Sequence, residues 1–496
     1  MNTKIKRRTT PSNKRQSCPV LHPLQRQGRN SMHASLRGPL LFCLIVIATI
    51  SPQPAFSSDL KLSFDRTLKT ASTTDQAVFD DSLPTPPPSL MMSESLGHFP
   101  TLNGLSTGEP GMDEEESDIR SEWSGHVSGE LRWFPEDGLQ GQDENLYPAF
   151  SLQAEYLREW NDGYDQFTFT PFMRVDYHDS RRTHADIREL SWVHVEENYE
   201  LRMGVRKVFW GVTESQHLVD IINQSDLVES TDGEEKLGQP MFNIAFDKEW
   251  GMLDLFVLPF NRLRTYPGKD ARFRTTYWVD DKQAIFESEL EEWQPGVAVR
   301  WMQSFGDWDV GLSHFSGMSR DPRFIVGTRH GSETVLIPYY ERIDQTGLDI
   351  QATLESWLLK LEAISRSGQG SRRYAAATAG FEYTLVGIFE SDADLGFIAE
   401  YLYDDRREGA PTPFQNDLML GMRLAMNDEQ STEALFGVIT DLDHNATLMN
   451  LEGSRRLGDS WKLSLEGRAL IDISDKDPLT IWRRDQMVQL ELTRYF

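Results

Sequence analysis

From Trp123 to the end of the chain, apolar and polar residues alternate in one segment after another. In one such segment Trp461, Leu463 and Leu465 alternate with Lys462 and Ser464. Because successive side chains of a β-strand point to opposite faces, each segment has one apolar and one polar face. Many segments run for about 10–14 residues, whereas soluble strands usually have about 5–6 and membrane strands need about 9–11. The pattern therefore predicts long antiparallel strands of the membrane type.

The alternation predicts 18 strands in an all-β barrel, with 16 as the lower bound. The strands are expected at residues 123–134, 147–160, 165–178, 183–196, 198–210, 241–250, 251–260, 295–304, 307–316, 344–354, 357–366, 373–387, 392–404, 415–427, 431–442, 446–456, 460–472 and 484–496.

The connections between these strands alternate in length. When the connections are numbered in chain order, the odd ones are long, for example 135–146, 211–240, 261–294 and 317–343. The even ones are tight, for example 161–163 and 458–459. Short turns on one side and long loops on the other are typical of transmembrane β-barrels. An even number of strands also places both ends of the barrel on the short-turn side. A soluble β-sandwich remains the alternative, because it shows the same alternation within each strand.

Aromatic residues gather beside the short turns, among them Trp160, Trp250, Trp308 and Trp357. Amphipathic rings favour the bilayer interface, so this pattern indicates one of the two aromatic girdles of a membrane barrel. The alternative is the ordinary enrichment of aromatic residues in strands.

The N-terminal segment, residues 1–57, predicts a cleaved signal peptide. It holds nine of the 50 Lys and Arg residues, no Asp or Glu, and an apolar run at 39–50 that is short for a membrane helix. Ala55 and Ser57 supply the small residues of a cleavage site, and Met32 is a possible true start. An uncleaved anchor helix is the alternative.

Residues 58–122 are expected to form a disordered periplasmic tail, because they are rich in Pro and Ser and hold an acidic run at 113–118. After Ser57, 41 basic residues remain against 77 acidic ones, a formal charge of −36. This balance argues against nucleic acid as a partner. Cys18 and Cys43 both lie in the predicted signal peptide. The mature chain, which consists of the tail and the barrel at 123–496, is therefore expected to have no thiol.

The signal peptide, the strand periodicity and the terminal Phe496 together resemble Gram-negative outer-membrane porins. The resemblance implies that the barrel-assembly machinery reads the C-terminal strand, where Val488, Leu490 and Leu492 fit the porin pattern and Arg494 departs from it. It also implies an outer-membrane location, contact with lipid and lipopolysaccharide, and a possible homotrimer.

A second, local resemblance covers Gly204-Val-Arg-Lys-Val-Phe-Trp-Gly211, followed by Asp220-Ile-Ile-Asn223 and Asp226. This stretch is similar to the strand–loop segment of alginate-export-like and related uncharacterised porins. It implies export of an anionic polysaccharide as an alternative to passive diffusion.

Sequence patterns for chemistry do not point to an enzyme. Zincin, P-loop, nucleophile-elbow and CxxC patterns are absent from the sequence. Two groups, His217 with Asp220 and Asp441 with Asp443 and His444, have metal-ligand chemistry, but such isolated groups are more often loop polar residues. We therefore predict no catalytic residue, metal or cofactor. An outer-membrane barrel hydrolase, built from residues on separate strands, is the alternative.

The polar face of the strands is expected to line an aqueous channel, since barrels of 16–18 strands enclose one. The alternative role for its charges is pairing across strands. The pore-lining candidates are Glu130, Arg132, Arg174, Glu200, Arg202, Arg206, Arg300, Lys360, Arg423, Glu466 and Arg468, and the same inward series includes Asp176, Glu362, Glu382, Glu400 and Glu491.

The long connection 211–240 is the candidate constriction. We expect residues 216–223 to form a short helix and the loop to fold into the barrel, where its apolar residues would be covered; an outward loop is the alternative. His217, Asp220, Asn223 and Asp226 are its candidate functional residues. The predicted function is a porin-like channel for passive or weakly selective diffusion of small hydrophilic solutes.

Overall fold

The computed structural model describes residues 119–496, apart from 371, 408–409, 411, 445 and 476. The predicted signal peptide and nearly all of the predicted tail lie outside the described residues.

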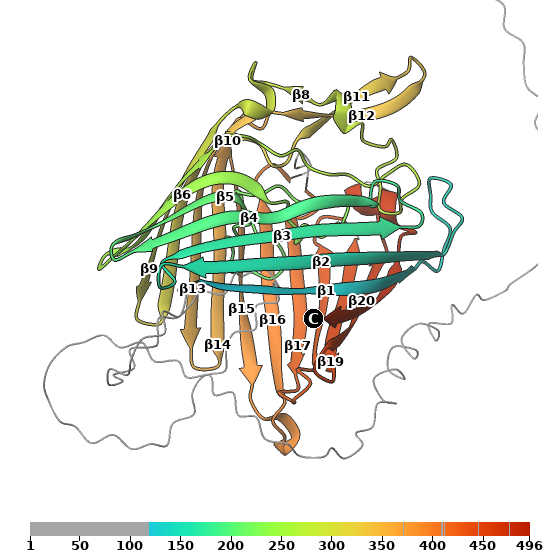
Figure 1. The fold of residues 1–496 in the computed structure, drawn as a ribbon. Coiled ribbons are helices and arrows are strands. Elements are labelled where there is room, and N and C mark those ends of the chain that lie inside the picture. The colour runs from blue at the N-terminus through green and yellow to red at the C-terminus, as the bar shows by residue number, and fades with distance from the viewer. Residues whose placement is uncertain (1–118, 371, 408–409, 411, 445, 476) are drawn as a thin grey trace, which may run out of the picture. The chain divides into compact units, whose positions relative to one another are not determined.

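Eighteen strands form one antiparallel barrel in which each strand pairs with its neighbour in sequence, and β1 pairs with β21 to close the ring (Figure 1). The closing register runs from His126 opposite Tyr495 to Trp133 opposite Val488. The barrel strands are β1 (Arg120–Trp133), β2 (Leu146–Trp160), β3 (Asp165–Asp176), β4 (His184–Glu196), β5 (Tyr199–Arg206), β6 (Gln239–Lys248), β7 (Gly251–Leu258), β9 (Gly296–Phe305), β10 (Trp308–Met318), β13 (Arg342–Leu354), β14 (Trp357–Ser367), β15 (Tyr374–Leu385), β16 (Asp394–Asp404), β17 (Asn416–Ala425), β18 (Glu433–Asp441), β19 (Thr447–Leu457), β20 (Trp461–Ile471) and β21 (Met487–Tyr495).

The predicted barrel is confirmed, including its strand number. Its apolar stripes face outward: on β17, Leu418, Leu420 and Met422 are 37%, 54% and 45% exposed, while Asp417 and Met419 between them point inward and are buried. An exposed apolar surface around a closed ring of strands suits lipid, because each strand is hydrogen-bonded to two neighbours and no edge strand is open.

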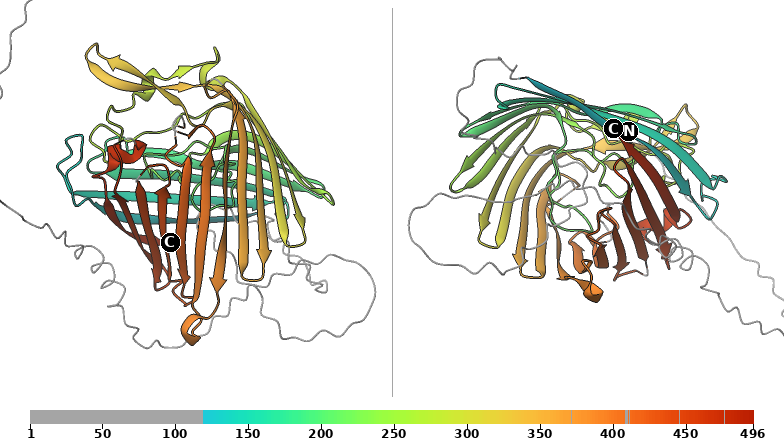
Figure 2. Two further views of the ribbon diagram at one scale, coloured as in Figure 1. Left: turned by 180° about the vertical axis from the view of Figure 1, so that it is seen from behind. Right: turned by 60° about the horizontal axis from the view of Figure 1, so that its bottom comes forward.

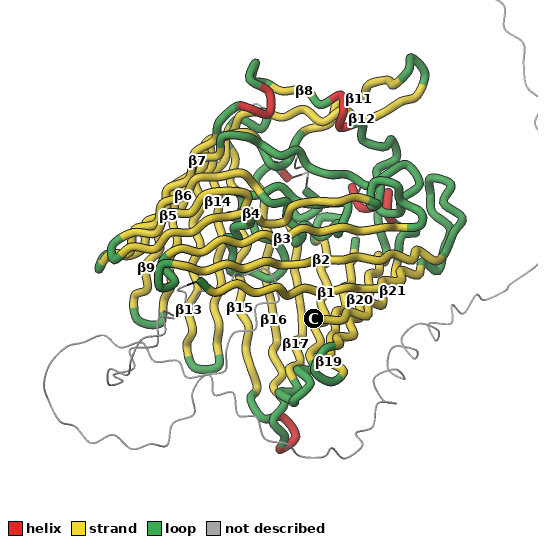
Figure 3. Tube along the Cα trace, viewed as in Figure 1, coloured by secondary structure: helices red, strands yellow, loops and turns green. Residues whose placement is uncertain are grey.

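The two rims of the barrel differ (Figure 3). Tight turns join the strands at one rim, such as Asn161–Gly163, where three successive residues have positive φ. The other rim carries the long connections. One of them, residues 207–238, is called the interior loop below, because it lies within the ring of strands (Figure 2, right).

A three-stranded sheet above the long-loop rim was missed by the sequence prediction. It consists of β8 (Ile285–Phe286), β11 (Arg323–Arg329) and β12 (Glu333–Tyr340), with β11 antiparallel and β8 parallel to β12 (Figure 1). These strands lie inside connections that were expected to be irregular. β8 has only two residues and pairs with residues 54 positions further along the chain, and β11 and β12 have only seven and eight residues, so local periodicity carried little signal for them.

The only helices among the described residues are 3-10 turns: η1 (Asp281–Gln283), η2 (Glu291–Trp293), η3 (Ile388–Glu390) and η5 (Pro478–Trp482). A helix long and apolar enough to cross a bilayer is absent from the described part of the chain.

Candidate functional site inside the barrel

The interior loop crosses the full width of the barrel. The loop leaves β5 after Arg206, four residues earlier than the strand was expected to end. Eight residues later, Glu214 of the loop pairs with Arg423 on β17. In the order of pairing, β17 is the ninth strand from β5 in either direction around the ring of 18. The loop therefore reaches the opposite wall within eight residues.

Two buried carboxylates of the far wall hold the backbone of the loop. Glu362 on β14 accepts hydrogen bonds from the backbone N–H groups of Val212, Thr213 and Val219 at 2.7, 3.1 and 3.1 Å. Glu362 is fully buried, so these bonds replace water for both partners. Its charge strengthens them, because hydrogen bonds to ionised acceptors are the strong ones.

Glu400 on β16 holds the next two residues in the same way. It accepts from the backbone N–H groups of Glu214 and Ser215, both at 2.8 Å, and from the Ser215 hydroxyl at 2.6 Å. Beside it, the Gln216 amide donates to the Thr378 hydroxyl of β15 at 2.8 Å. A continuous stretch of the loop is thus bonded to three adjacent strands, through its backbone to β14 and β16 and through the Gln216 side chain to β15.

These bonds explain why the short helix expected at 216–223 does not form. A helix would need the N–H of Val219 for an i−4 carbonyl, but it donates to Glu362. The stretch contains a single turn, in which the N–H of Asp220 donates to the carbonyl of His217 at 3.3 Å. The spacing of apolar and polar residues in this stretch does not reflect a helix. Its apolar side chains pack into a core with the wall, and its polar side chains lie beside charged partners.

The apolar side chains of the loop form a core with inward-facing residues of β6 to β15. Val219, Ile221 and Ile222 are each at most 1% exposed. Trp210 packs edge-on against Phe256 of β7, with ring centroids 5.7 Å apart. The other members of this core are Met241, Leu258, Ala298, Phe315, Ile343, Ile364, Tyr374 and Ala376.

The second half of the loop returns to the wall near β1, β3 and β4. Asp226 accepts a hydrogen bond from Arg188 of β4 at 2.6 Å, and Glu229 accepts one from Arg174 of β3 at 2.8 Å. Arg174 also pairs with Glu130 of β1 at 2.8 Å. Buried charges of both signs therefore alternate from the loop to the wall, which keeps each of them paired.

The candidate constriction residues all lie in the interior loop and have partners there. His217 lies 3.2 Å from Glu234 and 3.7 Å from Glu362. Asp220 pairs with Lys236 at 2.9 Å. The Asn223 amide donates to the carbonyls of Arg206 and Leu237, and its oxygen accepts from the N–H of Val208.

The environment of His217 favours its charged form. Burial lowers the pKa of its imidazole, but the neighbouring carboxylates of Glu234 and Glu362 outweigh burial and raise the pKa to about 10. At neutral pH the ring is therefore a cation held between two carboxylates, one of the loop and one of the wall.

The candidate pore-lining residues face the interior in ion pairs. Arg132 and Arg174 pair with Glu130, Arg202 with Glu200, Arg300 with Asp349, and Arg468 with both Glu466 and Asp232. Lys360 and Arg423 lie between Glu214 and Glu382. Arg206 lies 3.9 Å from Glu189. Around the interior, these side chains are therefore paired with neighbours of opposite charge.

Sequence reasoning missed the role of Glu362 and Glu400 as holders of loop backbone, and it missed Arg188 and Glu229 altogether. A charge at an inward strand position carries no sign of whether water, a neighbouring strand or a loop will meet it. The only sequence signal was the group of apolar residues on both sides of Asp220, which must be shielded from water.

A small cavity opens beside the second half of the loop. Its volume is about 40 Å³, enough for a few water molecules but too small for a sugar ring. Arginines and aromatic rings share its wall, namely Arg132, Arg182, Arg272, Arg468, Phe134, Tyr147 and Phe273.

No protein-family model and no curated protein match this chain. Solved structures similar to it include Wzi of Escherichia coli, an outer membrane protein involved in group 1 capsule assembly and described as a carbohydrate-binding β-barrel. The two sequences are 10% identical, the alignment covers 77% of this chain and 84% of Wzi, and the TM-score is 0.44. A loop-deletion mutant of OmpT, an outer membrane protein of Vibrio cholerae, has 9% identity, 77% and 100% coverage and a TM-score of 0.40. A mutant of the Rh. blastica porin has 9% identity, 76% and 100% coverage and a TM-score of 0.36.

The chain folds as a transmembrane β-barrel. The closed ring of 18 strands, the exposed apolar exterior and the contrast between the two rims lead to this conclusion independently of those likenesses.

Proposed function

We propose that this protein is a channel for small hydrophilic solutes, narrowed by the interior loop. The observation that carries the proposal is the ion pair between Glu214 and Arg423, which holds the loop across the whole interior at a level where both walls are charged. A loop tied to opposite walls reduces the cross-section without sealing the barrel along every strand.

The wall beside the loop favours polar solutes. On β19 and β20 the inward-facing Asn450, Glu452, Ser464 and Glu466 are polar and only half-buried. A wall of this kind replaces part of the hydration shell of a sugar or ion while offering hydrogen bonds in return. Acidic and basic side chains both occur around the interior, so we expect weak charge selectivity.

Export of an anionic polysaccharide is the second candidate function. It is supported by the four arginines around the cavity beside the loop, because arginine binds carboxylates; the cavity itself would admit only a carboxylate group and not a sugar ring. Against it, these arginines already have acidic partners, such as Asp485 for Arg272 and Asp232 for Arg468.

Reconstitution into planar lipid bilayers tests the channel directly. We expect stable stepwise ion conductance, with a reversal potential close to zero in a tenfold salt gradient because the interior charges are mixed. Liposome swelling with neutral sugars of increasing size should give the exclusion limit. A folded, membrane-inserted protein that conducts no ions would refute the proposal, and a block by uronate oligomers but not neutral ones would favour the polysaccharide alternative.

A further inference from the structure

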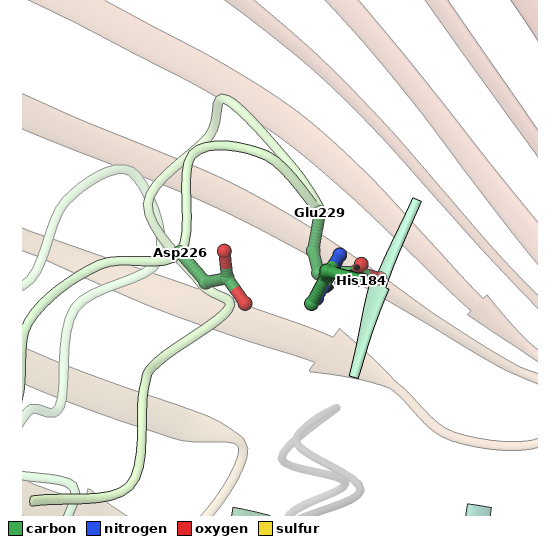
Figure 4. Close-up of side chains that lie close together, drawn as sticks. All are labelled: His184, Asp226 and Glu229. Carbon is green, nitrogen blue, oxygen red and sulfur yellow. Dashed lines mark ion pairs between the residues drawn. The ribbon is translucent and has the colours of Figure 1, made fainter. Parts of the chain in front are cut away.

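Three side chains with metal-ligand chemistry converge where the interior loop returns to the wall. His184 is the first residue of β4, and Asp226 and Glu229 belong to the loop. One ligand atom from each lies within 4.8 Å of the other two. Figure 4 shows Glu229 directed at His184, with Asp226 approaching from an earlier part of the loop.

The hydrogen bonds of His184 leave one ring nitrogen directed at Glu229. Its Nδ1 lies 3.1 Å from the carbonyl oxygen of Arg182, so a neutral ring keeps its proton on Nδ1. Its Nε2, with a lone pair, then faces Oε1 of Glu229 at 3.5 Å. A metal-binding histidine is commonly oriented in this way by a carbonyl behind it.

Glu229 supplies an independent sign that something is missing between these atoms. It is 6% exposed, and among the described residues its Oε1 has no hydrogen-bond partner. Nη2 of the Arg188 guanidinium lies 3.9 Å from this oxygen, too far for a hydrogen bond. A buried carboxylate oxygen that has no hydrogen bond and faces a lone pair is unfavourable, because both atoms are acceptors. A cation between them removes the conflict.

We propose that His184, Asp226 and Glu229 bind one divalent transition-metal ion of the Zn²⁺ type. One imidazole and two carboxylates are a ligand set that such ions accept, with a water molecule in the remaining position. To bind the ion, the three ligand atoms, which now lie within 4.8 Å of one another, move closer together.

The neighbours of the site orient the two carboxylates and set the affinity. Arg188 and the Thr265 hydroxyl each donate to Asp226 at 2.6 Å, and Arg174 donates to the second oxygen of Glu229 at 2.8 Å. These bonds fix the carboxylates in place. Because the arginines also neutralise them, the affinity must come largely from the imidazole. This selects Zn²⁺ over Ca²⁺, which binds oxygen ligands through their charge.

A metal at this point would tie the interior loop to β4. Metal binding itself does not depend on the channel, whereas any effect on conductance rests on the proposed function. The two therefore fail separately in experiment.

The test is Zn²⁺ titration of the full-length barrel in detergent, after chelator treatment, by calorimetry. We expect about one bound ion per chain, and a loss of affinity of at least about tenfold in His184→Ala and Glu229→Gln, since even changes behind the ligands cost about 10–100-fold. His178→Ala, in the connection just before β4, is the matched control and should bind as the wild type does. Ca²⁺ should not compete.

Co²⁺ absorption of the wild-type protein gives a second measurement that does not depend on the variants folding. Visible bands typical of nitrogen and oxygen ligation in a low-coordinate site are expected, and Zn²⁺ should abolish them. Absence of such bands, absence of stoichiometric Zn²⁺ binding, or an equal loss in His178→Ala would overturn the site and leave a proton shared between His184 and Glu229.

Discussion

Glu214 of the interior loop and Arg423 of β17 form an ion pair with Oε2 and Nη2 2.6 Å apart, at the wall opposite the strand from which the loop begins. The two residues are 209 positions apart in the sequence. Lys360 and Glu382 flank the pair, so a cluster of two basic and two acidic side chains holds the loop across the barrel. The position of the loop thus depends on a contact that exists only after the ring has closed.

A double-mutant cycle with Glu214→Ala and Arg423→Ala should show strong coupling between these residues. We expect a coupling energy of about 1–3 kcal/mol, because the pair is largely shielded from water and removing one partner leaves a charge uncompensated. Hydrogen exchange of the loop measures its opening, and single-channel conductance should rise or become noisy in each variant. Additive effects of the two changes would show that the pair does not hold the loop.

Glu362→Gln should release the loop from β14. The amide oxygen keeps one acceptor, but the new NH₂ group faces backbone donors, and each buried donor left unpaired costs about 1–3 kcal/mol. We expect hydrogen exchange at 212–219 to accelerate by about tenfold or more while the barrel strands keep their protection. Glu491→Gln is the control, because Glu491 faces the interior on β21 and accepts from Thr493 of its own strand. Equal acceleration in both variants would contradict the role assigned to Glu362.

The His217 imidazole should titrate near pH 10 instead of near its ordinary 6.5, because Glu234 and Glu362 stabilise its cation more than burial opposes it. A pKa raised by folding stabilises the folded loop fully below about pH 6.5, and the contribution is lost as the pH rises through about 10. NMR of labelled histidine measures the midpoint. The midpoint should fall in Glu362→Gln, and a wild-type midpoint near 6.5 would disprove the prediction.

Leu420→Arg should destabilise the barrel in lipid by about 2–4 kcal/mol, since Leu420 lies midway along β17 on the outward face. Leu442→Arg is a matched control: both leucines are 54% exposed, but Leu442 follows the end of β18 in a connection at the long-loop rim. Equilibrium unfolding from lipid vesicles with guanidinium gives the two free energies. Equal small effects at both positions would mean that the outward face of β17 does not meet acyl chains.

Much of the fold was predictable because a membrane barrel meets two solvents at every strand. Lipid outside requires an apolar residue at every second position, as at Leu418, Leu420 and Met422. That requirement repeats along each strand, so all 18 barrel strands were found, with ends displaced by only a few residues. The three-stranded sheet over the rim meets water on more of its surface and lacks the same constraint.

The candidate site was predictable only in part. Four candidate residues, His217, Asp220, Asn223 and Asp226, were named from one apolar and polar stretch, and all four belong to the interior loop, with His217 beside β14 and Asp226 beside β4. Their partners were not assigned, and the short helix expected there was wrong, because the wall carboxylate of Glu362 takes the N–H of Val219 that a helix would use.

The sequence by itself determined which residues form the barrel strands, how many barrel strands there are, and which face of each points outward, because these depend on a local period of two enforced by solvent. Only the tertiary structure decided that Glu362, Glu400 and Arg423 hold a loop that starts on the opposite wall, and that His184 meets Glu229. Ring closure brings strands that are distant in sequence to face one interior. The partner of each charge there depends on the three-dimensional arrangement of the strands and the loop, which a local sequence pattern does not contain.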